Sequence, residues 1–190
     1  EMYEQPSTVR ETIGTRVTAG APTQVDGLDF TAAQLQNLHQ IYIIGCGTAM
    51  HAGLAAKPMF EHLTHIPTQV DVASEFRYRD PLVDDRTLCI FISQSGETAD
   101  TIAALRLAKA AGAATLAVSN VIGSSITREA DYTVYTHAGP EIAVASTKAY
   151  TAQVVLLAVL AIALNLRTLE KNGKQLSEGD LSTPVDTRRL

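Results

Sequence analysis

The sequence has few aromatic residues, no tryptophan and only two cysteines. Because aromatics make up 5% of the chain, few side chains are available to stack on a base, which argues against nucleotide binding. No cysteine–histidine spacing typical of zinc occurs, and neither a metal nor another cofactor is expected. Cys46 and Cys89 lie in or beside apolar stretches and are interpreted as core thiols, which are typical of a reducing cytoplasm.

The sequence also lacks an excess of positive charge. Its net charge is −5 at pH 7, which argues against nucleic acid and anionic membranes as partners. The most apolar run, residues 154–164, is shorter than the roughly 20 residues that cross a bilayer, and no signal peptide is recognised. An anionic ligand would therefore be held by local hydrogen-bond donors rather than by a broad positive field.

Apolar strand and helix patterns alternate regularly over the 190 residues, which are enough for one α/β domain. We predict strands at residues 41–44, 69–73, 88–92, 115–118 and 132–135. We predict helices at residues 7–17, 31–40, 49–63, 102–111, 125–129 and 146–166. The first helix is given Ser7 as its N-cap, and the second a capping box of Thr31 and Gln34. Because strands that alternate with helices pair in parallel through right-handed crossovers, the predicted fold is a three-layer, doubly wound α/β domain with a five-stranded parallel sheet of flavodoxin-like type.

A cluster of small polar residues follows the predicted central strand. It reads S-Q-S-G-E-T over residues 93–98 and leads into a helix. A helix N-terminus offers unpaired N–H groups and the positive end of a dipole, so three hydroxyls and a glycine there form a cradle for phosphate or another anion. An N-cap alone would need one hydroxyl, and we therefore favour an anion site over a simple cap. Glu97 is expected to point away from a bound anion, favoured by the helix dipole.

A turn with two glycines, G-C-G-T over residues 45–48, follows the first predicted strand. It is not interpreted as a dinucleotide-binding fingerprint, because the third glycine of that motif would fall at Met50. No Gly-Lys-Ser/Thr sequence of a P-loop follows the strand either. This turn and the turns at residues 93–98 and 119–125 all come after strands, so we expect them at the same edge of a parallel sheet.

Together, the C-G-T turn and the S-x-S-G-x-T turn resemble those of the sugar isomerase (SIS) domain family. Three further stretches sharpen the resemblance: Y-E-Q-P from Tyr3, A-S-E-F-R-Y-R from Ala73 and E-I-A-V-A-S-T-K-A-Y-T from Glu141. From Tyr3 to about Leu166, the chain resembles the first SIS domain in the isomerase region of the glutamine–fructose-6-phosphate aminotransferase family, the glucosamine-6-phosphate synthases. The resemblance implies an enzyme that transfers the amide nitrogen of glutamine to fructose 6-phosphate and isomerises the product to glucosamine 6-phosphate.

The resemblance implies a substrate site in this chain but no catalytic residue. It assigns binding of the phosphosugar's phosphate to Ser93, Gln94, Ser95 and Thr98, and contacts with the sugar to Gly47, Thr48, Val144 and Ser146. The chain departs from the family pattern at Ala49, where a serine is usual, and at Ala143, where a glycine is usual. One hydroxyl contact is therefore expected to be lost or replaced.

The same resemblance implies that this chain is one part of a larger enzyme. In the family, the Schiff-base lysine, the proton-moving glutamate and the ring-opening histidine belong to a second SIS domain and the C-terminus, and the glutamine-hydrolysing cysteine to an N-terminal glutaminase domain. The chain alone is therefore expected to be inactive, and its start, Glu1-Met2, suggests a piece of a longer polypeptide. The predicted divisions are an approach segment at 1–27, the phosphosugar-binding domain at 28–168 and a linker towards the second SIS domain at 169–190.

Two alternatives stay open from the sequence. A non-catalytic SIS module that senses a phosphosugar in a transcription regulator would have a DNA-binding helix-turn-helix upstream, and a flavodoxin-like nucleotide binder would need aromatics that are scarce here. His51 is interpreted as a capping or solvated residue, and Lys148 as a phosphate contact or a surface lysine. Glu75 and Arg77 are interpreted as an ion pair at a subunit contact.

The predicted helix at residues 146–166 is apolar on nearly all of its faces. In a monomer of this size one side of such a helix would meet water, and a contiguous exposed apolar surface usually marks an interface. The resemblance adds that SIS domains of this family pair with one another. We therefore predict a homodimer.

Overall fold

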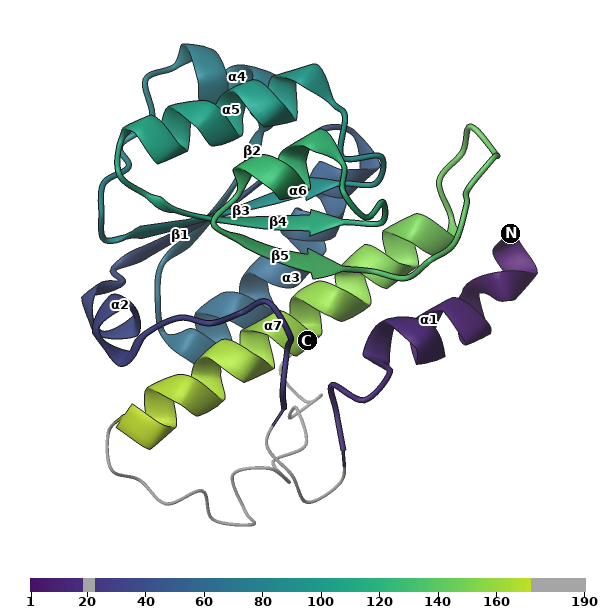
Figure 1. The fold of residues 1–190 in the computed structure, drawn as a ribbon, viewed down its shortest axis with the longest axis horizontal. Helices are drawn as coiled ribbons and strands as arrows, with labels where there is room; N and C mark the ends of the chain where they lie inside the picture. The colour runs from purple at the N-terminus through teal and green to yellow at the C-terminus, as the bar shows by residue number, and fades with distance from the viewer. Residues whose placement is uncertain (19–22, 172–190) are drawn as a thin grey trace.

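The computed structural model describes residues 1–18 and 23–171 and has a five-stranded parallel sheet at its centre (Figure 1). The strand order is β2-β1-β3-β4-β5, which is the flavodoxin-like order of a doubly wound sheet. The strands are β1 (Gln40–Gly45), β2 (Thr68–Val72), β3 (Thr87–Ser93), β4 (Ala114–Ser119) and β5 (Tyr132–Tyr135). The fold class is confirmed, and the bounds of every strand agree with the prediction to within one residue.

Helices cover both faces of the sheet and give the three predicted layers (Figure 1). One face is covered by α2 (Ala32–Asn37), α3 (Thr48–Thr64) and α7 (Lys148–Lys171). The other face is covered by α4 (Ala73–Tyr78), α5 (Ala99–Ala110) and α6 (Ser125–Glu129). Because side chains alternate between the faces along a strand, Leu88, Ile90 and Ile92 of β3 join the core beneath α3 and α7, whereas Cys89 and Phe91 join the core beneath α4 and α5.

The N-terminal helix begins earlier than predicted. α1 (Gln5–Ile13) follows the short 3-10 helix η1 (Met2–Glu4) and has Glu4 rather than Ser7 at its N-cap. Ser7 lies inside the helix, where its hydroxyl donates to the carbonyl oxygen of Glu4 at 2.7 Å. Pro6 in the first turn favours the earlier start, because a proline there loses no hydrogen bond. The capping box predicted for α2 is confirmed.

The apolar helix α7 is covered by its own domain on most sides, and one face of it meets water in part, as predicted: Tyr150, Val154, Val155 and Ala158 are half-buried and Ile162 is exposed. α3 and the sheet cover one side of α7, and α1 lies along another (Figure 1). Among the α7 side chains that the structure describes, Ile162 is the one exposed large apolar residue, at 36%. By length and composition α7 is long and apolar enough over Lys148–Asn165 to cross a membrane, a longer stretch than the apolar run at residues 154–164 considered in the sequence. Its burial, which covers 61% of that window, is what a core helix shows.

Candidate functional site

A cavity lies at the edge of the sheet where the carboxyl ends of β1 and β3 meet. β1 is paired with β2 on one side and with β3 on the other, so the connections that follow β1 and β3 diverge here. Gly45 pairs in register with Ile92, and the turns after the two strands therefore start side by side. Doubly wound sheets bind their ligands at such a switch point.

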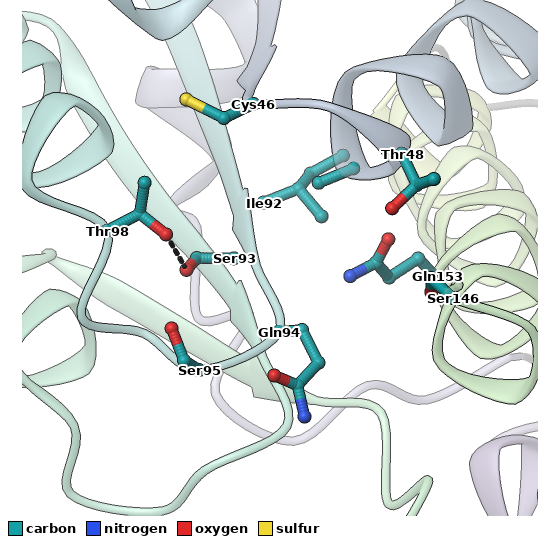
Figure 2. A pocket seen from close by; sticks show the side chains of 10 residues that line it. Cys46, Thr48, Ile92, Ser93, Gln94, Ser95, Thr98, Ser146 and Gln153 are labelled. Carbon is teal, nitrogen blue, oxygen red and sulfur yellow. Dashed lines mark hydrogen bonds between the residues drawn. The ribbon is translucent and has the colours of Figure 1, made fainter. Parts of the chain in front are cut away.

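The cavity has a volume of about 200 Å³ and is lined by three segments of the chain (Figure 2). The lining residues are Cys46, Thr48 and Ala49 after β1, Ile92, Ser93, Gln94, Ser95 and Thr98 at and after the end of β3, and Ser146 and Gln153 before and within α7. At about 30 Å³ for each water molecule, this volume corresponds to roughly six or seven waters. The cavity therefore suits a small polar molecule rather than a dinucleotide.

The hydroxyls of the turn at residues 93–98 order the turn and do not cap α5. The Gly96 N–H donates to Ser93 Oγ at 3.0 Å, and the Glu97 N–H donates to Ser95 Oγ at 3.2 Å. Thr98 Oγ1 lies 3.2 Å from Ser93 Oγ (Figure 2). Although Thr98 is the N-cap residue of α5, its side chain makes no capping hydrogen bond. The first amides of α5 thus receive no capping bond from Thr98, which favours the anion site over the simple cap.

The third predicted turn, which follows β4, packs against the turn at residues 93–98 and does not line the cavity. Gly96 has a positive φ of 70°, and a Cβ atom there would lie 2.0 Å from Ser124 Oγ. The Gly96 carbonyl oxygen accepts from the Ile126 N–H at 3.0 Å. Glu97 points away from the cavity as predicted, and its Oε1 accepts from the Ser125 N–H at 2.8 Å. Hydrogen bonds from Ser125 hold the pKa of Glu97 below its usual range.

Glu141 fixes the third wall of the cavity, a role that the sequence prediction missed. Its Oε1 accepts from the N–H groups of Thr147, at 2.8 Å, and Ala149, at 3.2 Å, and so binds the start of α7. Its Oε2 accepts from the Ser146 hydroxyl at 3.0 Å. An acidic residue shortly before a predicted helix is the signal that could have revealed this contact.

Six of the eight predicted site residues line this one cavity: Thr48, Ser93, Gln94, Ser95, Thr98 and Ser146. Gly47 and Val144 are not among its lining residues. Gly47 precedes α3 with a positive φ of 57°, and the Val144 side chain is fully exposed. Of the unpredicted lining residues, Gln153 gave the weakest signal, because no motif includes it and it lies among other polar residues at the start of an otherwise apolar helix.

Two interpretations of residues near the cavity need correction. Cys46 lies at the border of the core rather than inside it: it is half-buried, packs against the core beneath α4 and α5, lines the cavity and has its Sγ 3.7 Å from Thr101 Oγ1. Cys89 is buried as predicted, and desolvation raises the pKa of its thiol to about 12. Lys148 is neither a surface lysine nor a lining residue: it is 3% exposed, and its Nζ lies 2.6 Å from Glu4 Oε2.

The charged residues considered at the sequence level also have other partners. Arg77 pairs with Asp100 on α5, with 3.6 Å between their charged groups, instead of with Glu75. His51 is exposed, and its Nδ1 lies 2.9 Å from the carbonyl oxygen of Gly47 one turn earlier, so it is a solvated residue and does not cap α3. Within the described part of the chain, the cavity is lined by uncharged side chains alone. An anion there would be held by hydroxyls, a carboxamide and backbone amides.

The fold and the cavity define the class of the protein: an α/β domain with a small polar cavity at the switch point of its sheet. The family model of the SIS domain matches residues 34–163, a range that contains all the residues lining the cavity. The chain belongs to the SIS domain family.

Proteins similar to this chain confirm the more specific resemblance. The chain is 51% identical over 185 residues to the glutamine–fructose-6-phosphate aminotransferase (isomerizing) of Clostridium acetobutylicum, and 51% identical over 187 residues to that of Clostridium tetani. These matches cover 96% and 97% of this chain but 30% and 31% of the relatives. The C-terminal domain of glucosamine-fructose-6-phosphate aminotransferase from Francisella tularensis superposes with a TM-score of 0.81 at 40% identity, covering 92% of this chain and 48% of that one. The transcription-regulator alternative is not favoured.

Proposed function

We propose that this chain is the phosphosugar-binding part of an enzyme that transfers the amide nitrogen of glutamine to fructose 6-phosphate and isomerises the product to glucosamine 6-phosphate. The observation that carries this proposal is the hydroxyl-lined cavity at the β1/β3 switch point, beside the uncapped N-terminus of α5. The names of the relatives support the reaction.

The proposed ligand has its phosphate at the turn of residues 93–98, where Ser93, Gln94, Ser95 and Thr98 bind it together with the first amides of α5. Hydroxyls and amides suit a phosphate because each donates a hydrogen bond to a charged oxygen. The sugar extends across the cavity towards Gly47, Thr48, Val144 and Ser146. Figure 2 supports this direction, since Thr48 and Ser146 lie on the side of the cavity opposite Ser95 and Thr98.

The chain is expected to bind fructose 6-phosphate without converting it, because it carries hydroxyls for the phosphate but no proposed catalytic residue. Calorimetry with fructose 6-phosphate, glucose 6-phosphate and unphosphorylated fructose measures the binding. A discontinuous assay for glucosamine 6-phosphate and glucose 6-phosphate measures the turnover. Equal affinity for fructose and fructose 6-phosphate would contradict the phosphate site. Turnover by a preparation free of contaminating enzyme would show that the chemistry has been misplaced.

We further propose that the chain is the first of two SIS domains in a cytoplasmic protein with an N-terminal glutaminase domain. The chain spans about 30% of the length of the aminotransferases that it matches, which leaves room for these parts. The proposed divisions are an approach segment at 1–27, the SIS domain at 28–168 and a linker at 169–190. Most of that linker lies outside the described residues.

A homodimer remains a prediction, and beside the partly exposed face of α7 the loops at the carboxyl edge of the sheet offer a second basis for it. Val121, Ile122, Ile142 and Val144 expose between 43% and 105% of their surface there, and exposed apolar surface often marks an interface. Light scattering over a dilution series is expected to show a dimer that Ile122→Lys weakens. Leu82→Lys is the control, because Leu82 is 86% exposed in the segment that leads into the amino end of β3. A monomer at tens of micromolar would contradict the prediction.

A further inference from the structure

One polar side chain of the cavity has a buried oxygen without a hydrogen-bond partner in the part of the chain that the structure describes. Gln153 lies in the second turn of α7 and is 4% exposed. Its Oε1 is buried and accepts no hydrogen bond from the described residues. Buried polar atoms are normally paired, because an unpaired one loses its hydrogen bonds to water without replacement. The buried, unpaired Oε1 of Gln153 therefore lowers the stability of the folded chain.

The position of Gln153 indicates which part of a ligand could supply the missing hydrogen bond. The residue lines the cavity together with Thr48 and Ser146, on the side opposite Ser95 and Thr98 (Figure 2). Figure 2 shows its Nε2 turned into the cavity and its Oε1 turned towards Thr48. A ligand with its phosphate at the turn of residues 93–98 would therefore present its uncharged end to this carboxamide.

We propose that Gln153 binds the sugar end of the phosphosugar and helps to select it, an inference that rests on the proposed function. A carboxamide both donates and accepts hydrogen bonds, so it matches the neighbouring oxygens of a sugar, each of which can do the same. Ala49 lines the same cavity and offers no hydroxyl. Because the carboxamide is buried, a ligand without matching oxygens leaves it unpaired and is bound less tightly.

The test replaces Gln153 by methionine, which keeps the length of the side chain and removes its hydrogen bonds. Calorimetry is expected to show affinity for fructose 6-phosphate reduced about 5- to 50-fold, the effect of losing one or two hydrogen bonds. Affinity for inorganic phosphate, measured by competition, is expected to stay within twofold, because the turn at residues 93–98 alone holds that ion. Gln69→Met, which changes an exposed glutamine of β2, is the matched control and should alter neither affinity.

Thermal unfolding provides a second readout, which a purely structural role would move in the opposite direction. Replacing a buried unpaired carboxamide by an apolar group of similar shape is neutral or stabilising. The melting temperature of Gln153→Met without ligand is therefore expected to equal or exceed that of the unchanged chain. A clear fall in melting temperature together with an equal loss of affinity for both ligands would assign Gln153 to the core and overturn the proposal.

The remaining outcomes separate this inference from the proposed function. If the unchanged chain binds no hexose 6-phosphate, the proposed function fails and the inference fails with it. If the chain binds fructose 6-phosphate through Ser95 and Thr98 but Gln153→Met binds it equally well, only the inference about Gln153 is overturned. Weaker binding of fructose 6-phosphate, unchanged binding of inorganic phosphate and an undiminished melting temperature together support it.

Discussion

Replacing Ser95 and Thr98 together by alanine is expected to weaken the binding of fructose 6-phosphate at least tenfold. Each hydroxyl lines the cavity beside the start of α5, and neither is used to cap that helix. A hydrogen bond to a charged group contributes about 1.5–3 kcal/mol, and each 1.4 kcal/mol is about tenfold in affinity. The loss of two such bonds therefore lowers the affinity more than tenfold, even if water replaces them in part.

The double variant is measured by calorimetry beside a circular dichroism spectrum that checks its fold. Ser7→Ala combined with Thr15→Ala removes two hydroxyls of the N-terminal segment, outside the cavity lining, and should leave the affinity unchanged. Unchanged affinity in a folded Ser95→Ala, Thr98→Ala protein would show that the phosphate does not bind at the turn of residues 93–98.

The substitution Gly96→Ala is expected to lower both stability and phosphosugar affinity. A Cβ atom at this position would meet Ser124 Oγ at 2.0 Å and Ser124 Cβ at 2.4 Å, and the positive φ of 70° disfavours any side chain. Overpacking costs about 1–3 kcal/mol and the left-handed backbone about 1–2 kcal/mol. The free energy of unfolding should therefore fall by about 2–5 kcal/mol, measured by urea unfolding, with the hydroxyls of the turn displaced.

A second glycine separates the two causes. Gly123 has nearly the same φ, 72°, but no atom lies within 4 Å of a Cβ placed there. Gly123→Ala should therefore show the backbone penalty alone, about 1–2 kcal/mol, with little change in affinity. If Gly96→Ala proves no more costly than Gly123→Ala, the close packing between the turns after β3 and β4 is wrong.

Much of the fold could be predicted because local patterns and the sheet agree. The strand 88–92 reads as buried on both faces, and all seven residues of β3 are buried. The parallel order then brings the turns after β1 and β3 together, which is why six predicted residues share one cavity. The start of α1 was missed because Ser7 is a good cap by composition, while Pro6 and the preceding 3-10 helix favour an earlier start.

Other features depend on contacts between distant parts of the chain. α1 covers α7, and Glu4 pairs with Lys148, 144 residues away. No periodicity or motif in the sequence indicates which helix shields which, and the extent to which α1 and α3 cover α7 could therefore not be predicted. Gln153 belongs to the same class, because a glutamine near the start of an apolar helix shows its burial only after the helix is packed.

The most direct measurement of the central claim, that a phosphosugar binds with its phosphate at the turn after β3, is an amide NMR titration of the chain with fructose 6-phosphate. The largest shift changes are expected in the amides of residues 94–101, with smaller changes around Thr48 and Ser146. Inorganic phosphate should reproduce the changes in the turn but not those near Thr48. Changes centred elsewhere in the chain, or none in residues 94–101 at saturating ligand, would contradict the site.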